Sequence, residues 1–272
     1  MNPSGLSVFS SIIYVIHRSR YYTTSTAATG YLVFAFRFPL FSPMTITERV
    51  LNLIFPPSCL SCLTRLKRGV VCAGCISKIQ PHQTPFCGQC GSRLPYGKKI
   101  CHPKFPYILG AVSDYDNATI KSLIHGLKFN YVARAALPLS ELLIRYAEPL
   151  LIIPNDALVI PVPLGAGRRR KRGFNQAELI AKPLAEHFNL SFLPKTLRRI
   201  RNTRPQSELK HLRDRRENVK GCFAVGEPEA IQGKTIILVD DVVTSGSTLY
   251  EAAWTLKAAG ARKIIALVAA KA

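Results

Sequence analysis

A strand, an acidic pair and a hydroxyl-rich turn follow one another in the stretch IILVDDVVTSGSTL, from Ile236 to Leu249. Residues 235–239 are apolar after the first, which is typical of a buried strand. Beyond the turn, apolar residues recur at helical spacing, at Leu249, Ala252, Ala253 and Leu256. Gly260 then ends the helix, and residues 264–270 are apolar again. Strand, helix and strand in this order predict a parallel sheet.

The turn and the acidic pair have the chemistry of a sugar phosphate site. The turn consists of Thr244, Ser245, Gly246, Ser247 and Thr248, whose amides and hydroxyls can surround a phosphate where the helix dipole favours negative charge. Gly246 has no side chain and lets the backbone approach the phosphate closely. Asp240 and Asp241 repel each other beside a buried strand, a cost that is offset if sugar hydroxyls or a magnesium ion bind them. We predict a ribose 5-phosphate pocket; the alternative is an ordinary capping turn.

Further apolar patterns place this unit in a larger α/β domain. Helical spacing recurs at Ile120, Leu123, Ile124 and Leu127, at Leu139, Leu142, Leu143 and Tyr146, and between Ala177 and Phe188. Residues 157–163 read as a buried strand that is followed by a basic loop, and Pro183 is expected to kink the third helix. Residues 107–272 are long enough for a normal core.

The charge of the chain is strongly positive. The 37 Lys and Arg exceed the 16 Asp and Glu by 21, which favours anionic ligands such as phosphate, pyrophosphate or nucleic acid. Residues 165–220 alone hold 16 basic and five acidic residues, including the run Arg168, Arg169, Arg170, Lys171 and Arg172. The run follows a strand of the same α/β domain, where ligands of parallel sheets gather, so we predict contact with pyrophosphate or DNA. The alternative is a solvated loop.

Seven of the eight cysteines lie between positions 59 and 101, which indicates structural zinc in a reducing compartment. The alternatives are buried free thiols or a redox pair. Cys59, Cys62, Cys72 and Cys75 form two CxxC pairs and complete one tetrahedral site. Cys87, Cys90 and Cys101 lack a fourth ligand. His102 or His82 would supply it, although joint ligation by the adjacent Cys101 and His102 is strained, so the second zinc is in doubt. Crossed pairing between the two sets stays open.

The first part of the chain differs from the rest, because residues 1–47 contain no Asp or Glu. Its apolar runs are too short to span a bilayer, and no stable transmembrane segment is expected. Three interpretations stay open: an unstructured extension, a weak surface anchor, or translated upstream sequence with the start at Met44. The last is favoured, because a helix, TITERVLNLIF, begins there. We therefore divide the chain into an extension (1–43), a zinc ribbon (44–106) and an α/β domain (107–272).

Two resemblances are specific. VDDVVTSGST looks like the phosphoribosyl pyrophosphate (PRPP) motif of type I phosphoribosyltransferases, in which the acidic pair holds the ribose hydroxyls and the turn binds the 5-phosphate. From about Met44 onward the chain resembles the ComF/GntX family of competence and DNA-utilisation proteins. The matching segments are LNLIFPPSCLSC with the cysteine pairs, IKSLIHGLKF, PVPLGAGRRRKRGFNQAELIAKPLA and TRPQSELKHLRDRRENVKGCF. Two departures are Lys104 where members often complete another CxxC, and TSGST where TTGAT is common.

The resemblance implies a type I phosphoribosyltransferase-like parallel sheet flanked by helices and preceded by a double zinc ribbon. It also implies binding of PRPP with magnesium, and a cytoplasmic role in DNA uptake, transformation or nutrient use of DNA. The chemistry open to PRPP is displacement of pyrophosphate at ribose C1, but no residue is identifiable as a general base, so the catalytic residues and the acceptor stay open. The alternative is a single-stranded DNA binding protein, or an adaptor to the DNA-uptake machinery, with a regulatory or vestigial pocket.

Overall fold

The computed structural model describes residues 56–95, 101–203 and 211–272, all within the compact unit Asn52–Ala272. The extension 1–43, the helix expected at 45–55 and most of the TRPQSELK segment lie outside the described residues. No helix in the described ranges is both long and apolar enough to cross a membrane.

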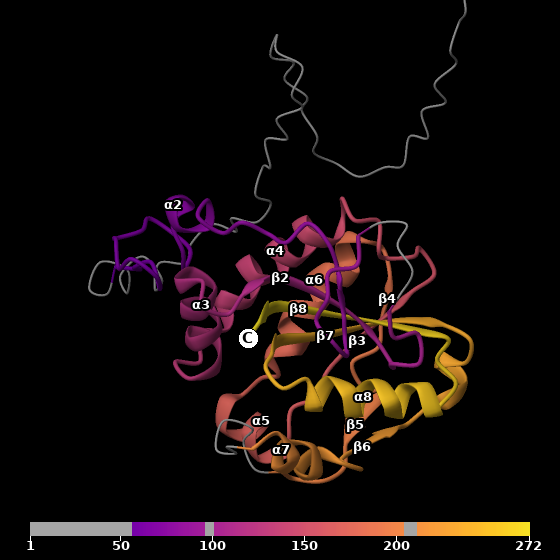
Figure 1. Cartoon of the computed structure of the whole chain (residues 1–272). Coiled ribbons are helices and arrows are strands. Elements are labelled where there is room, and N and C mark those ends of the chain that lie inside the picture. The colour runs from indigo at the N-terminus through magenta and orange to yellow at the C-terminus, as the bar shows by residue number, and fades with distance from the viewer. Residues whose placement is uncertain (1–55, 96–100, 204–210) are drawn as a thin grey trace, which may run out of the picture. The chain divides into compact units, whose positions relative to one another are not determined.

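A mainly parallel sheet of six strands forms the centre of the described unit (Figure 1), in the order β1-β2-β8-β7-β3-β4. The strands are β1 (Phe86–Cys87), β2 (Ile108–Asp114), β3 (Leu158–Pro161), β4 (Ser191–Phe192), β7 (Thr235–Val243) and β8 (Lys263–Lys271). All neighbouring pairs are parallel except β1 and β2. Because parallel partners run the same way, the carboxyl ends of β7, β8 and β3 lie at one edge of the sheet.

Helices cover both faces of the sheet, and each face has its own core (Figure 1). On one face lie α3 (Ala118–Lys128), α4 (Ala136–Ala147) and α6 (Gln176–His187); on the other lies α8 (Ser247–Ala258). β7 shows why both faces are apolar: Ile237 and Val239 belong to the first core, whereas Ile236 and Leu238 belong to the second. Successive side chains of a strand alternate between faces, so a doubly covered strand must be apolar throughout.

The α/β fold expected from the sequence is confirmed, and two local expectations need adjustment. β7 continues to Val243, so the acidic pair lies inside the strand rather than after it. The basic run is not a loop, because it forms α5 (Ala166–Arg172), which Gly173 ends with a φ of 81°. Pro183 lies inside α6, as the sequence predicts. A short helix suits the basic run because arginine and lysine have good helix propensity.

The remaining elements lie in the ribbon and beside the main sheet. The ribbon contains α2 (Ala73–Ile76) and β1, and β1 extends the central sheet by pairing with β2. β5 (Leu197–Arg199) and β6 (Phe223–Val225) form a separate antiparallel pair, and α7 (Leu212–Val219) precedes β6. Two short 3-10 helices, η1 (Ala133–Ala135) and η3 (Pro228–Ile231), complete the described elements. Backbone pairing with β2 thus ties the ribbon to the α/β domain.

Candidate functional site

The acidic pair is buried at the carboxyl end of β7, and one member is already paired with a lysine. Asp240 Oδ1 accepts a hydrogen bond from the Asp241 amide at 2.8 Å. Asp241 Oδ1 lies 2.7 Å from Nζ of Lys128, at the end of α3. Asp241 Oδ2 is buried and has no hydrogen-bond partner in the described part of the chain. A buried acceptor without a partner is costly unless a ligand satisfies it.

The electrostatics of the pair follow from this burial. Burial and, secondly, the charge of Asp241 raise the pKa of Asp240 to about 7, although Lys128 acts against both. Two arginines interact electrostatically with the pair. Burial lowers the pKa of Arg172, while Asp241 and Asp240 raise it; burial likewise lowers the pKa of Arg199, while Cys222 and Asp240 raise it. Arg199 Nε is buried and, among the described groups, has no hydrogen-bond partner. Buried ionic groups of both signs with unpaired atoms are typical of functional sites.

The turn begins α8 with its glycine in the left-handed region. Gly246 has a φ of 72° and precedes the first helical residue, Ser247. The hydroxyls of Ser245 and Ser247 lie 3.0 Å apart, so the two side chains face each other across the turn. The first amides of a helix have no partner within the helix and carry partial positive charge. The turn therefore presents donors and hydroxyls beside the acidic pair.

Gly246→Ala is expected to impair this turn. A Cβ at this position meets the Tyr107 hydroxyl at 3.1 Å, and a left-handed conformation costs about 1–2 kcal/mol for an alanine. Thermal unfolding should show a lower melting temperature, and phosphate binding should weaken. Gly167→Ala is the matched control, because a Cβ there has no neighbour within 4 Å and lies in α5. An equal melting temperature for wild type and Gly246→Ala would contradict the prediction.

The raised pKa of Asp240 predicts a pH dependence of stability in the ligand-free protein. Between the usual value of 3.8 and about 7, the unfolded chain is ionised while the folded carboxyl keeps its proton. The folded state then binds more protons, so stability falls as pH rises through this window. Asp240→Asn removes this loss, and its melting temperature relative to wild type should increase from pH 5 to pH 8.

The exposed Asp156 supplies the control, as Asp156→Asn. Each kcal/mol corresponds to roughly 2–4 °C in a domain of this size, so melting curves at the two pH values resolve the effect. A gain for Asp240→Asn that is the same at both pH values would refute the assignment.

The five residues of the basic run do not act as one surface. Arg172 donates a hydrogen bond to Gln176 and interacts electrostatically with the acidic pair, whereas Nη2 of Arg169 lies 3.4 Å from Oε2 of Glu178. Arg168 lines a cleft of about 230 Å³ with Gly165, Gly167, Asn202 and Thr203. Arg170 and Lys171 are exposed. The helix therefore presents only Arg168 and Arg172 to a cleft or to the acidic pair.

The first cysteine set comes together as the spacing predicts. The Sγ atoms of Cys59, Cys62, Cys72 and Cys75 all lie within 4.8 Å of one another, and Cys62 and Cys72 are 3.7 Å apart. A tetrahedral zinc with bonds of about 2.3 Å separates its sulfurs by about 3.8 Å, so the set fits the ion. A hydrogen bond with the Thr64 hydroxyl lowers the pKa of Cys62 to about 6, which favours the thiolate that binds metal.

The second set is completed by a histidine. Cys87, Cys90, Cys101 and His102 place their ligand atoms within 4.8 Å of one another, with Cys87 Sγ 3.4 Å from His102 Nδ1. His82, the other candidate for the fourth ligand, instead places its Nε2 3.5 Å from Oδ1 of Asp114. Joint ligation by the adjacent Cys101 and His102 was expected to be strained, yet the ligand atoms of both residues lie in one group with Cys87 and Cys90 that could hold a metal ion.

The two sets share a structural repeat with an offset of 28 residues, PSCLSCLTRL at 57–66 and PFCGQCGSRL at 85–94. In each copy the first cysteine amide bonds the carbonyl five residues on, Thr64 or Ser92. Hydrogen bonding with Ser92 also lowers the pKa of Cys90 to about 6, as Thr64 does for Cys62. Both knuckles therefore have the same backbone and the same bias towards thiolate.

Sequence reasoning missed Lys128 and Arg199 at the acidic pair. Lys128 lies in IKSLIHGLKF, which carries a resemblance but no recognisable chemistry, and Arg199 lies in β5 outside the arginine run. Both residues are far from the pair in the sequence. A local sequence pattern does not reveal that Lys128 and Arg199 lie near the acidic pair; only information on which distant positions are in contact would have revealed it.

Comparisons with known proteins agree with this architecture. Residues 50–103 match the double zinc ribbon domain family, and residues 175–272 match the phosphoribosyl transferase domain family. The fold and the site therefore define a zinc-ribbon protein with a phosphoribosyltransferase domain.

Curated relatives share most of the chain. A DNA utilization protein YhgH of Escherichia coli O157:H7 is 34% identical over 222 residues, which are 78% of this chain and 96% of that protein. One from Salmonella typhimurium is 34% identical over 71% of this chain and 87% of its own. The competence protein F of Haemophilus influenzae is 30% identical over 76% of this chain and 93% of its own length. The chain belongs to this ComF/GntX family of competence and DNA utilization proteins.

Proposed function

We propose that the acidic pair and the turn bind PRPP, or a related ribose 5-phosphate, together with magnesium. The observation that carries the proposal is the unpartnered Asp241 Oδ2, which is buried beside a hydroxyl-rich turn and opposite basic side chains. Ribose hydroxyls donate hydrogen bonds, and a sugar alcohol at Asp241 satisfies this acceptor. Thr244, Ser245, Gly246, Ser247 and Thr248 then lie where a 5-phosphate meets the amino terminus of α8.

The basic residues near the pair suit the other end of such a ligand. Arg172 and Arg199 interact electrostatically with the pair, and Arg199 has an unsatisfied Nε. Guanidinium groups bind phosphate oxygens in a bidentate manner, which supports a role in holding pyrophosphate. Lys128 neutralises Asp241 through Oδ1, which leaves Oδ2 for a ribose hydroxyl or for magnesium.

The reaction that this site serves is phosphoribosyl transfer. An acceptor forms a bond to ribose C1 while the bond from C1 to the pyrophosphate oxygen breaks, and the electron pair leaves with pyrophosphate. Magnesium supplies charge neutralisation on the pyrophosphate when it is bound. The chain contributes orientation of the sugar through the acidic pair and positive potential through the arginines, so catalysis rests on positioning and electrostatics.

The names of the relatives support a role in the use of DNA. The relatives are called DNA utilization proteins and a competence protein, and we propose the same setting, in the cytoplasm, for this chain. Reduced cysteine clusters that fit zinc support a reducing compartment.

Calorimetry of the full, zinc-loaded chain with PRPP tests the binding proposal, with and without magnesium. We expect binding that requires magnesium, and weaker binding of ribose 5-phosphate because it lacks the pyrophosphate. Absence of heat with both PRPP and magnesium present would overturn the proposal. Pyrophosphate release is then measured with bases, nucleotides and single-stranded DNA as acceptors. Release with one of these classes identifies the acceptor.

A further inference from the structure

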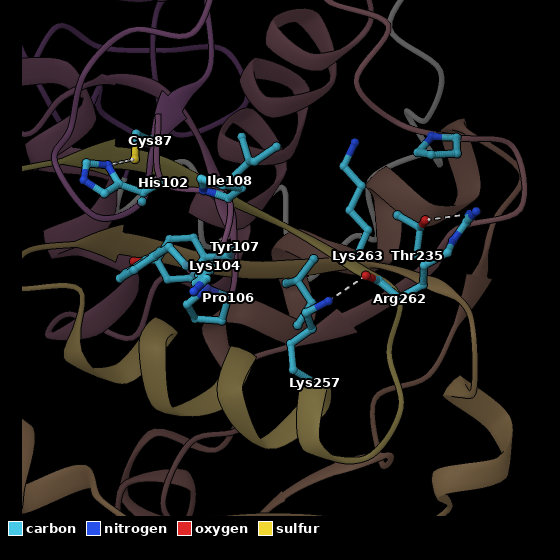
Figure 2. Close-up of a pocket in the computed structure, with 15 residues that line it drawn as sticks. Cys87, His102, Lys104, Pro106, Tyr107, Ile108, Thr235, Lys257, Arg262 and Lys263 are labelled. Atoms are coloured by element: carbon cyan, nitrogen blue, oxygen red, sulfur yellow. Dashed lines mark hydrogen bonds between the residues drawn. The ribbon is translucent and has the colours of Figure 1, made fainter. Parts of the chain in front are cut away.

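A second concave surface lies at the amino-terminal edge of the parallel strands, whereas the acidic pair lies near their carboxyl ends. It has a volume of about 520 Å³ and is lined by the beginnings of β2, β7 and β8, by the end of α8 and by ribbon residues 102–105. Figure 2 shows the Cys87 and His102 pair at one end and Lys257, Arg262 and Lys263 at the other. We call this surface the basic groove.

The charge of the basic groove has one sign. Its lining includes Lys104, Lys257, Arg262 and Lys263, which are all exposed, and no Asp or Glu. Among the described residues, none of these four forms an ion pair. Lys257 donates to the Arg262 carbonyl at 2.6 Å, and Arg262 donates to the Thr235 hydroxyl at 3.3 Å, so these two are held in place. Fixed cations without acidic partners complement a polyanion.

Aromatic rings continue the basic groove along α8. The ring centroid of Phe105, in the wall of the groove, lies 5.3 Å from that of Tyr250. The ring centroids of Tyr250 and Trp254 are 6.4 Å apart, and the angle between their ring planes is 6°. Tyr250 is 40% exposed and Trp254 is 53% exposed. Positions 250, 254 and 257 fall on one stripe of the helix, so the rings lead to Lys257. A soluble surface rarely places large rings and cations together unless both contact a ligand.

We propose that the basic groove and the rings of Tyr250 and Trp254 bind single-stranded nucleic acid. Cations that follow a backbone beside rings that stack on bases are the combination that binds unpaired strands. Bases in a duplex are stacked on each other, so exposed rings on a helix reach only unpaired ones. The basic groove lies at the opposite end of the strands from the acidic pair, although Tyr107 in its wall reaches the turn at Gly246. None of the residues that line it belongs to α5, where the sequence alone placed DNA contact.

The chain has a single tryptophan, Trp254, which reports directly on this surface. We expect a 20-nucleotide oligo-dT added to the full, zinc-loaded protein to quench the tryptophan fluorescence saturably. The same length of duplex should quench much less. Binding should weaken steeply with salt because counterions are released from the phosphates.

Two double charge reversals with the same net change locate the site. Lys104→Glu with Lys263→Glu should lower the affinity for oligo-dT at least tenfold, whereas Arg170→Glu with Lys171→Glu, on α5, should change it less than threefold. Lys104 and Lys263 are both exposed, as are Arg170 and Lys171, so both variants should fold, as circular dichroism and zinc content would verify. Trp254→Ala should lower the affinity about fivefold or more by loss of stacking, and Trp254→Phe should restore it.

Three outcomes overturn the inference. The first is oligo-dT binding without tryptophan quenching, or no binding at all. The second is a larger loss in the α5 variant than in the groove variant. The third is competition by a poly-glutamate peptide at equal charge concentration, which assigns the groove to acidic proteins. Calorimetry of the groove variant with PRPP and magnesium separates this inference from the proposed function, because PRPP binding should be unchanged.

Discussion

Asp240→Asn combined with Asp241→Asn is expected to reduce the affinity for PRPP with magnesium at least about 100-fold. A hydrogen bond to a charged group contributes about 1.5–3 kcal/mol, and the double variant weakens two of them, which together correspond to at least two orders of magnitude. Calorimetry at fixed magnesium measures the loss. Affinity within tenfold of wild type would show that the pair does not hold the sugar.

Two controls separate binding from folding. Asp156→Asn replaces one exposed carboxyl and should bind PRPP like wild type. Asp241→Asn leaves Lys128 without its partner at 2.7 Å, so the double variant is also made with Lys128→Gln. If Lys128 only neutralises Asp241 in the ligand-free protein, this triple variant should be at least as stable as the double variant and bind PRPP no better.

The purified protein is expected to contain two zinc ions per chain, and their removal by a chelator should unfold the ribbon. Structural zinc contributes about 10–16 kcal/mol in zinc-finger peptides, far more than a ribbon with few buried apolar side chains gains from packing. His102→Ala and Cys62→Ser should each lower the zinc content to one, because each removes a ligand from one set. Metal analysis and circular dichroism before and after chelation measure both effects.

Cys222→Ala is the matched control for zinc content. Cys222 is a buried free cysteine in the core beside α8, outside both sets, so its replacement should leave two zinc ions bound. One zinc per wild-type chain, unchanged in His102→Ala, would show that the second set does not bind metal and would restore the doubt that the spacing alone raised.

The two metal sets show how far spacing can predict a site. Cys59, Cys62, Cys72 and Cys75 were identified from two CxxC pairs, because two intervening residues suffice to point both sulfurs at one ion. For the second set, spacing left the fourth member open between His102 and His82. His102 follows Cys101 directly, and its reach depends on the path of the chain around Cys87, which no local pattern encodes.

In the phosphoribosyltransferase domain, too, the sequence predicted some elements and missed others. The run of apolar residues before the acidic pair and the helical spacing after the turn indicated a strand and a helix, and both are present as β7 and α8. The full length of β7 was not foreseen, because pairing with β8 extends the strand beyond the acidic pair. The helix α5 was not foreseen either, because a run of five charged residues is equally compatible with a solvated loop, although arginine and lysine favour a helix.

The sequence by itself determined three strands (β3, β7 and β8), four helices (α3, α4, α6 and α8), the acidic pair with its turn, and the first cysteine set, because periodicity and spacing act over short stretches of chain. It did not predict the central strand β2. Tertiary structure alone decided that Lys128 pairs with Asp241, that Arg199 interacts electrostatically with Asp240, and that Lys104 of the ribbon shares a groove with Lys263 of β8. These residues are far apart in the chain and meet only because strands pair and helices pack on both faces of the sheet.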